Sequence, residues 1–302
     1  MATSPALGGG RHGWPRWMAL FIAIMVAAPL ALHAPTTILA AAGTEQPTGR
    51  GPTQSAAQRA VALGETTAAD LGTIDVDIAI LDRRDDRISA NSSATTPTLS
   101  ASLAKLILAV DIVDRHRDAG TILGEPDLGL IGRALGPSDD LAMNELWTRF
   151  DGPAAIARVV ERLGLTGTAP PALPEFWGQT TITAIDVALV YRYVMGLSAA
   201  ERDLILTPLA FAPALAADGF LQDYGLLSPD VGGAAAKQGW MCCPDGSLYL
   251  HSAGLIGESG RFAVVLLGRG SPDLGWEVAR QELTTVAAAI TNTLTADARQ
   301  LS

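Results

Sequence analysis

The chain has 302 residues, and its 21 Lys and Arg against 31 Asp and Glu give a formal net charge of −10. So acidic a chain lacks the basic face that phosphate recognition needs, which argues against a nucleic-acid partner. Hydrophobic residues make up 48% of the chain, which excludes a disordered protein and allows a sizeable core. Two cysteines, Cys242 and Cys243, are too few for a disulfide-rich scaffold or an all-cysteine zinc site.

Residues 1–42 have the pattern of an export segment. Arg11 and Arg16 precede a stretch without charge, whose dense apolar part is Met18–Leu32. A basic flank followed by an apolar run is typical of a secretory signal peptide or of an N-terminal membrane anchor. Both alternatives stay open, and both predict an extracytoplasmic protein. If the segment is retained, the membrane is a partner of the chain.

The stretch between the apolar run and the expected domain has its own composition. Residues 43–53 are rich in Gly, Thr, Pro and Gln, which predicts a flexible linker. No cysteine occurs in this region or before it, so a lipid-modified N-terminal cysteine is not available there. We expect one domain over residues 54–302.

The domain begins with a helix and two strands. Residues 54–63 are Ala-rich and predict a helix. In residues 74–80, Ile and Val alternate with Asp and Ala, and this period of two predicts a half-buried strand. A charged turn over residues 82–86 leads to a return strand over residues 87–90.

The middle of the chain is helical and its end returns to strands. From about residue 102 to 205 the apolar residues follow a helical period, and a next helix is expected to begin near Thr181. Three strands are then predicted over residues 234–241, 248–255 and 262–267, followed by a last amphipathic helix.

This order of elements predicts an α/β protein of the α+β type. The most economical solution is one five-stranded antiparallel sheet built from both ends of the chain and packed by the terminal helices. An all-helical lobe over about residues 102–220 is inserted beside the sheet. The expected cleft runs between the sheet and this lobe.

The start of the helical block carries a candidate catalytic pair. Lys105 is the only charge in the apolar stretch 101–108, and it follows Ser102 by three positions. Three positions along a helix place both side chains on one face, within reach of each other. Burial favours the neutral amine, which can take the proton of a serine hydroxyl. The chain has one other lysine, Lys237, although it uses arginine 19 times.

Two further motifs follow the Ser-x-x-Lys element. They are Ser138-Asp139-Asp140, in a loop before a helix, and Lys237-Gln238-Gly239-Trp240, on the first late strand. In this order the three elements resemble the penicillin-recognising serine enzymes, which are the class A β-lactamases and the D-alanyl-D-alanine peptidases. Closer still is the resemblance to the LppW-type lipoproteins of actinobacteria. The resemblance to the penicillin-recognising enzymes covers about residues 54–296 and implies the β-lactamase/transpeptidase fold.

The resemblance implies a role for each matching residue. Ser102 matches the acylated nucleophile, and Lys105 matches the amine that activates or orients it. Ser138 matches the hydroxyl that relays a proton to the leaving nitrogen, and Lys237 matches the cation that attracts a substrate carboxylate.

The same resemblance assigns the substrate-binding positions. Its oxyanion hole would use the backbone N–H groups of Ser102 and of Trp240, which follows the strand glycine, Gly239. Asp140 would face the substrate, but the family usually has Asn at this position. An ionised carboxylate only accepts hydrogen bonds, so it would repel a substrate carboxylate and could pair with Lys105 or Lys237.

Two other positions depart from the family pattern. Gln238 stands where a Ser or Thr hydroxyl usually helps to bind the carboxylate, and its side chain is bulkier. Glu175 is the candidate base for deacylation because it lies at about the right distance beyond Ser138-Asp139-Asp140. It lacks the Leu-Asn pair that follows this glutamate in the family.

The remaining chemistry-bearing residues are few. A disulfide between the adjacent Cys242 and Cys243 would close a tight ring, and free thiols or a bond to another chain are the alternatives. His251 has no visible carboxylate partner, which argues against a Ser-His-Asp triad. No metal-ligand motif or phosphate-binding loop occurs, so no cofactor is expected.

Two functions remain in view. The first is an exported serine hydrolase that acts through acylation of serine on β-lactams or on cell-wall peptides. The second is a catalytically degenerate protein of the same fold that binds wall peptides without turnover.

Overall fold

The computed structural model describes residues 54–300, with side chains described up to residue 296. The predicted export segment, residues 1–42, and the linker, residues 43–53, lie outside the described residues. Within the described range, none of the helices combines the length and apolar character that a membrane span requires.

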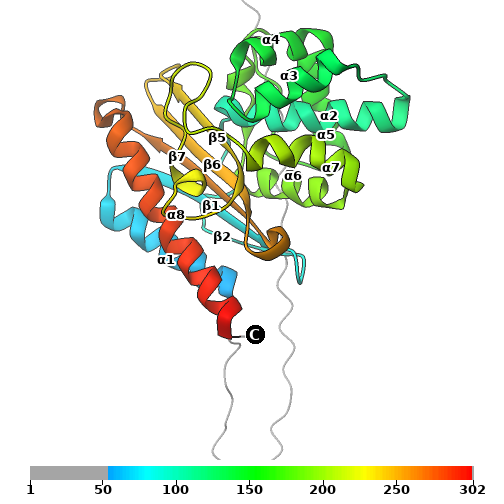
Figure 1. Ribbon diagram of the computed structural model, residues 1–302. Helices are drawn as coiled ribbons and strands as arrows, with labels where there is room; N and C mark the ends of the chain where they lie inside the picture. Colours follow the sequence, from blue (N-terminus) through cyan, green and yellow to red (C-terminus); the bar gives the residue numbers. More distant parts are fainter. Residues whose placement is uncertain (1–53, 301–302) are drawn as a thin grey trace, which may run out of the picture. The chain divides into compact units, whose positions relative to one another are not determined.

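The centre of the domain is one antiparallel sheet with the strand order β2-β1-β7-β6-β5 (Figure 1). Its strands are β1 (Ile74–Asp82), β2 (Arg87–Ala90), β5 (Ala235–Cys242), β6 (Leu248–Ile256) and β7 (Phe262–Gly270). The early and late parts of the chain meet where β1 pairs with β7 over nine residues. The predicted five-stranded antiparallel sheet is confirmed, with strand bounds that differ by at most a few residues.

The first and last helices, α1 (Ala56–Leu71) and α8 (Gly275–Gln300), pack on one face of the sheet (Figure 1). A Cβ atom on Gly64 of α1 would lie 2.7 Å from Cδ1 of Ile290, so this glycine permits the close approach of the two helices. The side chains of Ile78 and Val264 face this layer and are fully buried.

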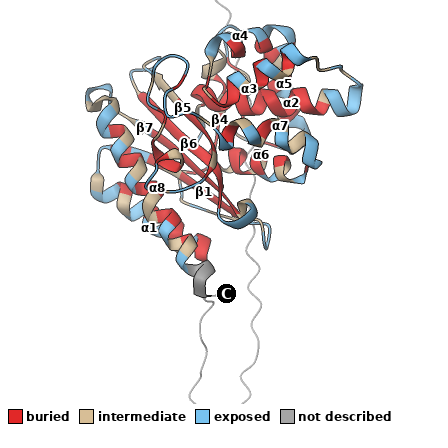
Figure 2. Ribbon diagram, in the orientation of Figure 1, coloured by how far each residue is buried: buried red, intermediate tan, exposed pale blue. Residues whose placement is uncertain are grey.

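The other face of the sheet packs against the helical lobe. Its helices are α2 (Ala104–Ala119), α3 (Glu125–Leu135), α4 (Asp140–Arg149), α5 (Gly152–Leu163), α6 (Ala184–Gly196) and α7 (Ala199–Ala210). Helix α2 lies at the centre of the lobe, where residues 104–114 are all buried (Figure 2). The alternate sheet residues Leu81 and Val265 share the core of this lobe.

Two sequence-based bounds were wrong. Helix α1 continues to Leu71, where Gly72, in a left-handed conformation, ends it. The helix expected near Thr181 begins at Ala184, because Thr183 accepts a hydrogen bond from the N–H of Asp186 and caps it. Residues 181–182 instead form β4, which pairs with β3 (Thr98–Leu99) just before the proposed nucleophile.

Candidate active site

Ser102 lies in the turn that leads into α2. The turn is the short 3₁₀ helix η1 (Ala101–Leu103), and its positive φ of 45° at Ala101 turns the chain sharply. The backbone N–H groups at such a helix start lack partners within the helix. Ser102 is 4% exposed, so its hydroxyl is held in a largely dry environment.

The amine of Lys105 joins the Ser102 turn to the loop before α4. Its Nζ atom lies 2.7 Å from Oγ of Ser102, 2.9 Å from the carbonyl oxygen of Ser138 and 3.2 Å from Oγ of Ser138. A fourth partner is Oδ1 of Asp140, at 2.6 Å. The serine–lysine spacing predicted from the sequence therefore produces direct contact.

Ser138 connects this amine to the second lysine. The Nζ atom of Lys237 donates to Oγ of Ser138 at 2.7 Å and to the carbonyl oxygen of Gln238 at 2.8 Å. Ser138 has a positive φ of 57° and is 3% exposed. The four residues proposed as catalytic thus form one connected chain, from Ser102 through Lys105 and Ser138 to Lys237.

The loop that carries Ser138 is fixed by the residue after it. Asp139 caps α4 by accepting hydrogen bonds from the N–H groups of Leu141 and Ala142. The same carboxylate binds the guanidinium of Arg133 through Oδ2. These contacts hold the start of α4, so that Ser138 and Asp140 point toward Lys105.

The two lysines differ in their electrostatic surroundings. Burial lowers the pKa of Lys105, while the Asp140 carboxylate opposes this change. Burial also lowers the pKa of Lys237 well below its usual range, and the neighbouring Lys105 lowers it further. Lys237 has no carboxylate within ion-pair distance among the side chains of residues 54–296, so it is the lysine that gives up its proton more readily.

Asp140 is an anion at a position where the family usually has a neutral amide. It forms an ion pair with Lys105, and its own side chain remains 58% exposed. The sequence left Lys105 and Lys237 open as partners of Asp140, and the structure shows the pair with Lys105. An ammonium donates three hydrogen bonds, and this pair uses one of them on a charged acceptor. The arrangement therefore favours the protonated form of the Lys105 amine.

Strand β5 forms the opposite wall of the site. A Cβ atom on Gly239 would lie 3.2 Å from the carbonyl oxygen of Ser100 and 3.4 Å from Cβ of Ala101. The glycine therefore permits β5 to lie close to the turn that carries Ser102. Because β5 is the edge strand, some of its backbone N–H groups face away from β6 toward this turn.

Gln238 does not take the place of the usual hydroxyl. Its fully buried side chain donates through Nε2 to the carbonyl oxygens of Gln222 and Tyr224, on the side away from Lys237. Adjacent strand residues point to opposite faces, which explains this separation. The substrate side of β5 therefore lacks a polar side chain at position 238.

The ring of Trp240 is held by contacts that the sequence did not predict. Its ring stacks on Phe220 with centroids 4.6 Å apart and an interplanar angle of 10°. Its Nε1 atom donates to Oδ2 of Asp218 at 3.0 Å. Trp240 also lines the cavity next to Ser102.

That cavity has a volume of about 280 Å³ and is bounded on one side by the loop before β4. The ring of Trp177, in this loop, lies over the amine of Lys105 at 4.7 Å, and its Nε1 atom donates to Asn144. Glu175 lines the same cavity, but its side chain makes no hydrogen bond or ion pair with the side chains described, which end at residue 296. The structure thus brings Glu175 to the site but gives it no contact with Ser102 or Lys105.

Three contributors to the site were not found from the sequence: Trp177, Asp218 and Phe220. Their places depend on two loops that carry no periodic pattern, so local sequence held no signal for them. His251 is fully buried, and burial lowers its pKa to about 4. Its Nε2 atom contacts the carbonyl oxygen of Leu99, so it supports the turn before Ser102. No carboxylate of the described part of the chain pairs with its ring.

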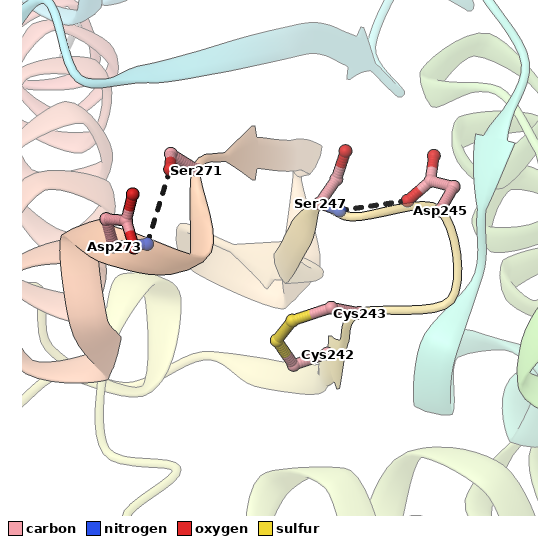
Figure 3. Close-up of a disulfide and its surroundings, with 6 residues drawn as sticks. All are labelled: Cys242, Cys243, Asp245, Ser247, Ser271 and Asp273. Carbon is pink, nitrogen blue, oxygen red and sulfur yellow. Dashed lines mark hydrogen bonds between the residues drawn. A yellow bond between two sulfur atoms is a disulfide. The ribbon is translucent and has the colours of Figure 1, made fainter.

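Cys242 and Cys243 end strand β5. The structure joins them in a disulfide across a cis peptide bond, next to the turn that Gly246 closes by donating to the carbonyl oxygen of Cys243 (Figure 3). Asp245 of this turn accepts a hydrogen bond from the N–H of Ser247. Within residues 54–296, no group of three or more His, Cys, Asp or Glu side chains could hold a metal ion.

Comparison with known proteins identifies the fold. The domain matches a class A β-lactamase from Bacteroides cellulosilyticus with a TM-score of 0.63 and 12% identity, over 81% of this chain and all of that one. A β-lactamase from Chitinophaga pinensis has a TM-score of 0.59 and 15% identity, over 80% and 99% of the two chains. The solved structure of PBP-A has a TM-score of 0.61 and 15% identity, over 78% of this chain and 96% of that one.

The chain has the fold of the class A β-lactamases. At sequence level, no protein-family model matches it. It is 31% identical over 221 residues to "Putative lipoprotein LppW" of Mycobacterium tuberculosis and of Mycobacterium bovis, which covers 70% of this chain. The match spans 66% of those relatives, just under two thirds of their length. The resemblance to β-lactamases and to LppW is therefore confirmed.

Proposed function

We propose that this protein is an exported serine hydrolase that acts on β-lactams or on cell-wall peptides through an acyl-enzyme at Ser102. The observation that carries the proposal is the contact of 2.7 Å between Nζ of Lys105 and Oγ of Ser102, both in buried residues. A nucleophile and a proton acceptor within hydrogen-bond reach are the minimum requirement for covalent catalysis. The β-lactamase fold supports the class of reaction.

In the proposed acylation, Oγ of Ser102 attacks the carbonyl carbon of a lactam or of a terminal peptide bond. Its proton passes to the amine of Lys105. The backbone N–H groups of Ser102 and Trp240 stabilise the oxyanion that develops. As the C–N bond breaks, Ser138 gives its hydroxyl proton to the leaving nitrogen and receives the proton held by Lys105, whose Nζ lies 3.2 Å from Oγ of Ser138, so both residues return to their starting protonation states. Lys237 supports this transfer through its contact of 2.7 Å with Oγ of Ser138.

The proposed hydrolysis of the acyl-enzyme is slow. It needs a base that aims a water molecule at the ester, and such help typically contributes about 100- to 10,000-fold. The ring of Trp177 covers Lys105 on the side of the loop, and Glu175 has no partner that would hold it against Ser102. The acyl-enzyme is therefore expected to accumulate.

One observation favours the second candidate, a wall-peptide-binding protein without turnover. Asp140 pairs with Lys105 at 2.6 Å and favours the protonated amine, which is a poorer proton acceptor for Ser102. A site of this kind would hold a peptide beside Ser102 without forming the ester.

The proposed location is outside the cytoplasm. The name of the LppW relatives refers to a lipoprotein, and residues 1–42 here carry the pattern of an export segment. Because residues 1–53 contain no cysteine, we propose that the apolar run provides any attachment to the membrane. A reporter fused after residue 53 that is active only in the cytoplasm would contradict this location.

The experiment that separates hydrolase from binding protein is intact-mass analysis after exposure to a penicillin, with Ser102→Ala as the control. A hydrolase gains the mass of one penicillin at Ser102. A binding protein stays unmodified.

A further inference from the structure

The disulfide between Cys242 and Cys243 joins neighbours in the chain, so it encloses no intervening residue. A disulfide stabilises a fold mainly by restricting the unfolded chain, and this effect grows with the number of residues that it encloses. A bond between adjacent residues therefore adds little to the stability of the whole domain. Its effect is confined to the place where strand β5 ends and the next turn begins (Figure 3).

The turn that follows the disulfide is held by contacts of its own. The carboxylate of Asp245 accepts hydrogen bonds from the N–H of Ser247 at 3.1 Å and from the hydroxyl of Tyr249 at 2.6 Å. It also pairs with the guanidinium of Arg269, on β7, at 3.0 Å. These contacts involve neither sulfur atom, so the turn stays attached to β6 and β7 when the S–S bond is open.

The other neighbour of the disulfide is the wall of the candidate active site. The two residues before it, Trp240 and Met241, both line the cavity beside Ser102. Met241 also lies against the loop that bounds this cavity, because a Cβ atom on Gly178 would be 3.4 Å from its Sδ atom. The disulfide therefore connects a fixed turn with a strand end that forms part of the site.

The disulfide is accessible from solvent. Cys242 is exposed, and Cys243 is half-buried. Cys242 is also the last residue of β5 that pairs with β6, opposite Leu248. Thiol–disulfide exchange needs access to one of the two sulfur atoms, and the exposed position of Cys242 provides it.

We propose that Cys242–Cys243 is a reversible exchange site for small thiols in the folded protein, and that opening it loosens the end of β5 at the wall of the site. A thiolate attacks Sγ of Cys242, the S–S bond breaks, and Cys243 leaves as a thiolate that takes up a proton. A second thiolate attacks the mixed disulfide, which releases the disulfide of the small thiol and leaves Cys242 as a thiol. Two electrons thus pass from two small thiols to the protein disulfide.

The first test measures exchange in the full chain under native conditions. Reduced glutathione is the reductant, and the free thiols are alkylated with iodoacetamide at successive times and counted by intact mass. We expect two alkyl groups on the folded protein, at a rate within about 10-fold of that for the chain unfolded in urea, because an exposed disulfide reacts without unfolding. Oxidised glutathione should then restore the bond. Slower reduction, or a bond that does not form again, would overturn the proposal.

Hydrogen–deuterium exchange measures the effect on the site wall. In the reduced protein, a peptide that covers the end of β5 should exchange at least about 3-fold faster than in the oxidised protein, and a peptide from α1 should be unchanged. The midpoint of thermal unfolding should fall by less than about 4 °C, because the bond encloses no chain. A larger fall, or equal exchange of the β5 peptide in both states, would contradict the assigned role.

The matched variant combines Cys242→Ser with Cys243→Ser. It takes up no alkyl group, and its β5 peptide should exchange as fast as that of the reduced protein, because both lack the S–S bond. Exchange as slow as in the oxidised protein would show that the bond does not hold the end of β5, and the proposal would fail. None of these measurements uses an acyl donor, so their outcome is independent of whether Ser102 is acylated.

Discussion

The carboxylate of Asp140 lies 2.6 Å from the amine of Lys105, on the same nitrogen that reaches Oγ of Ser102 at 2.7 Å. This relationship places a negative charge beside the group that must accept the proton of the nucleophile. An opposite charge at this distance favours the ammonium form and raises the pKa of the amine. The rate of acylation should therefore depend directly on Asp140.

Asp140→Asn should increase the rate of acylation by a penicillin about 10-fold at neutral pH. The amide carries no charge, so burial then lowers the pKa of Lys105 with less opposition. The neutral amine is populated at lower pH, and the rising limb of the pH–rate profile should move toward acid. Stopped-flow acylation rates over a range of pH measure this shift. An unchanged profile would mean that Lys105 does not accept the proton.

Lys105→Arg should reduce acylation by at least about 100-fold, because a guanidinium does not give up its proton at these pH values. The variant retains a cation next to Asp140, so the ion pair persists. Labelling with a fluorophosphonate probe measures the loss, and thermal unfolding checks the fold. Since Arg is bulkier at a buried position, Lys105→Met serves as the second variant. Labelling of both variants at the normal rate would contradict the assigned role.

Lys237→Met should stabilise the domain at neutral pH and make its stability less dependent on pH. The pKa of Lys237 is well below its usual range in the folded state, so the unfolded chain binds one more proton between the folded pKa and about 10.4. In that window, stability rises with pH and is lost as the pH falls. Lys237→Met removes the amine and with it this loss of stability at lower pH.

Thermal unfolding of Lys237→Met is the measurement, with the unmodified chain as reference. At pH 7 the midpoint of thermal unfolding of the variant should be at least about 2–4 °C higher than that of the unmodified chain. The difference between the two midpoints should shrink toward pH 10. A midpoint that falls at pH 7 and stays lower at pH 10 would show that Lys237 is a stabilising cation.

Glu175→Gln should leave the lifetime of the acyl-enzyme unchanged within about 2-fold, although general-base help is worth about 100-fold or more where it operates. Glu175 lines the cavity but contacts neither Ser102 nor Lys105. The decay of a purified acyl-enzyme, followed by intact mass, measures the lifetime. A large increase in lifetime would identify Glu175 as the deacylating base.

The sheet and the local part of the site could be predicted from the sequence. The alternation in residues 74–80 predicts a strand from local sequence alone, because successive side chains of a strand point to opposite faces of the sheet. In the same way, the spacing of Ser102 and Lys105 brings their side chains together within one helical turn.

The long-range part of the site could not be derived from local pattern. Lys237 reaches Ser138 only because strand β5 and the loop before α4 meet in the folded domain, 99 positions apart in the chain. The resemblance to a known family implied this meeting. Neither the resemblance nor a local pattern predicted the position of Trp177 over Lys105, because this position depends on the path of an irregular loop.

The central claim is that Ser102 forms a lasting acyl-enzyme. The most direct test follows the intact mass of the purified protein against time after one addition of a penicillin, beside steady-state hydrolysis. We predict a one-to-one adduct that persists, is absent in Ser102→Ala and is accompanied by slow hydrolysis at most. No adduct at any time and no hydrolysis, or an adduct that also forms on Ser102→Ala, would contradict the account.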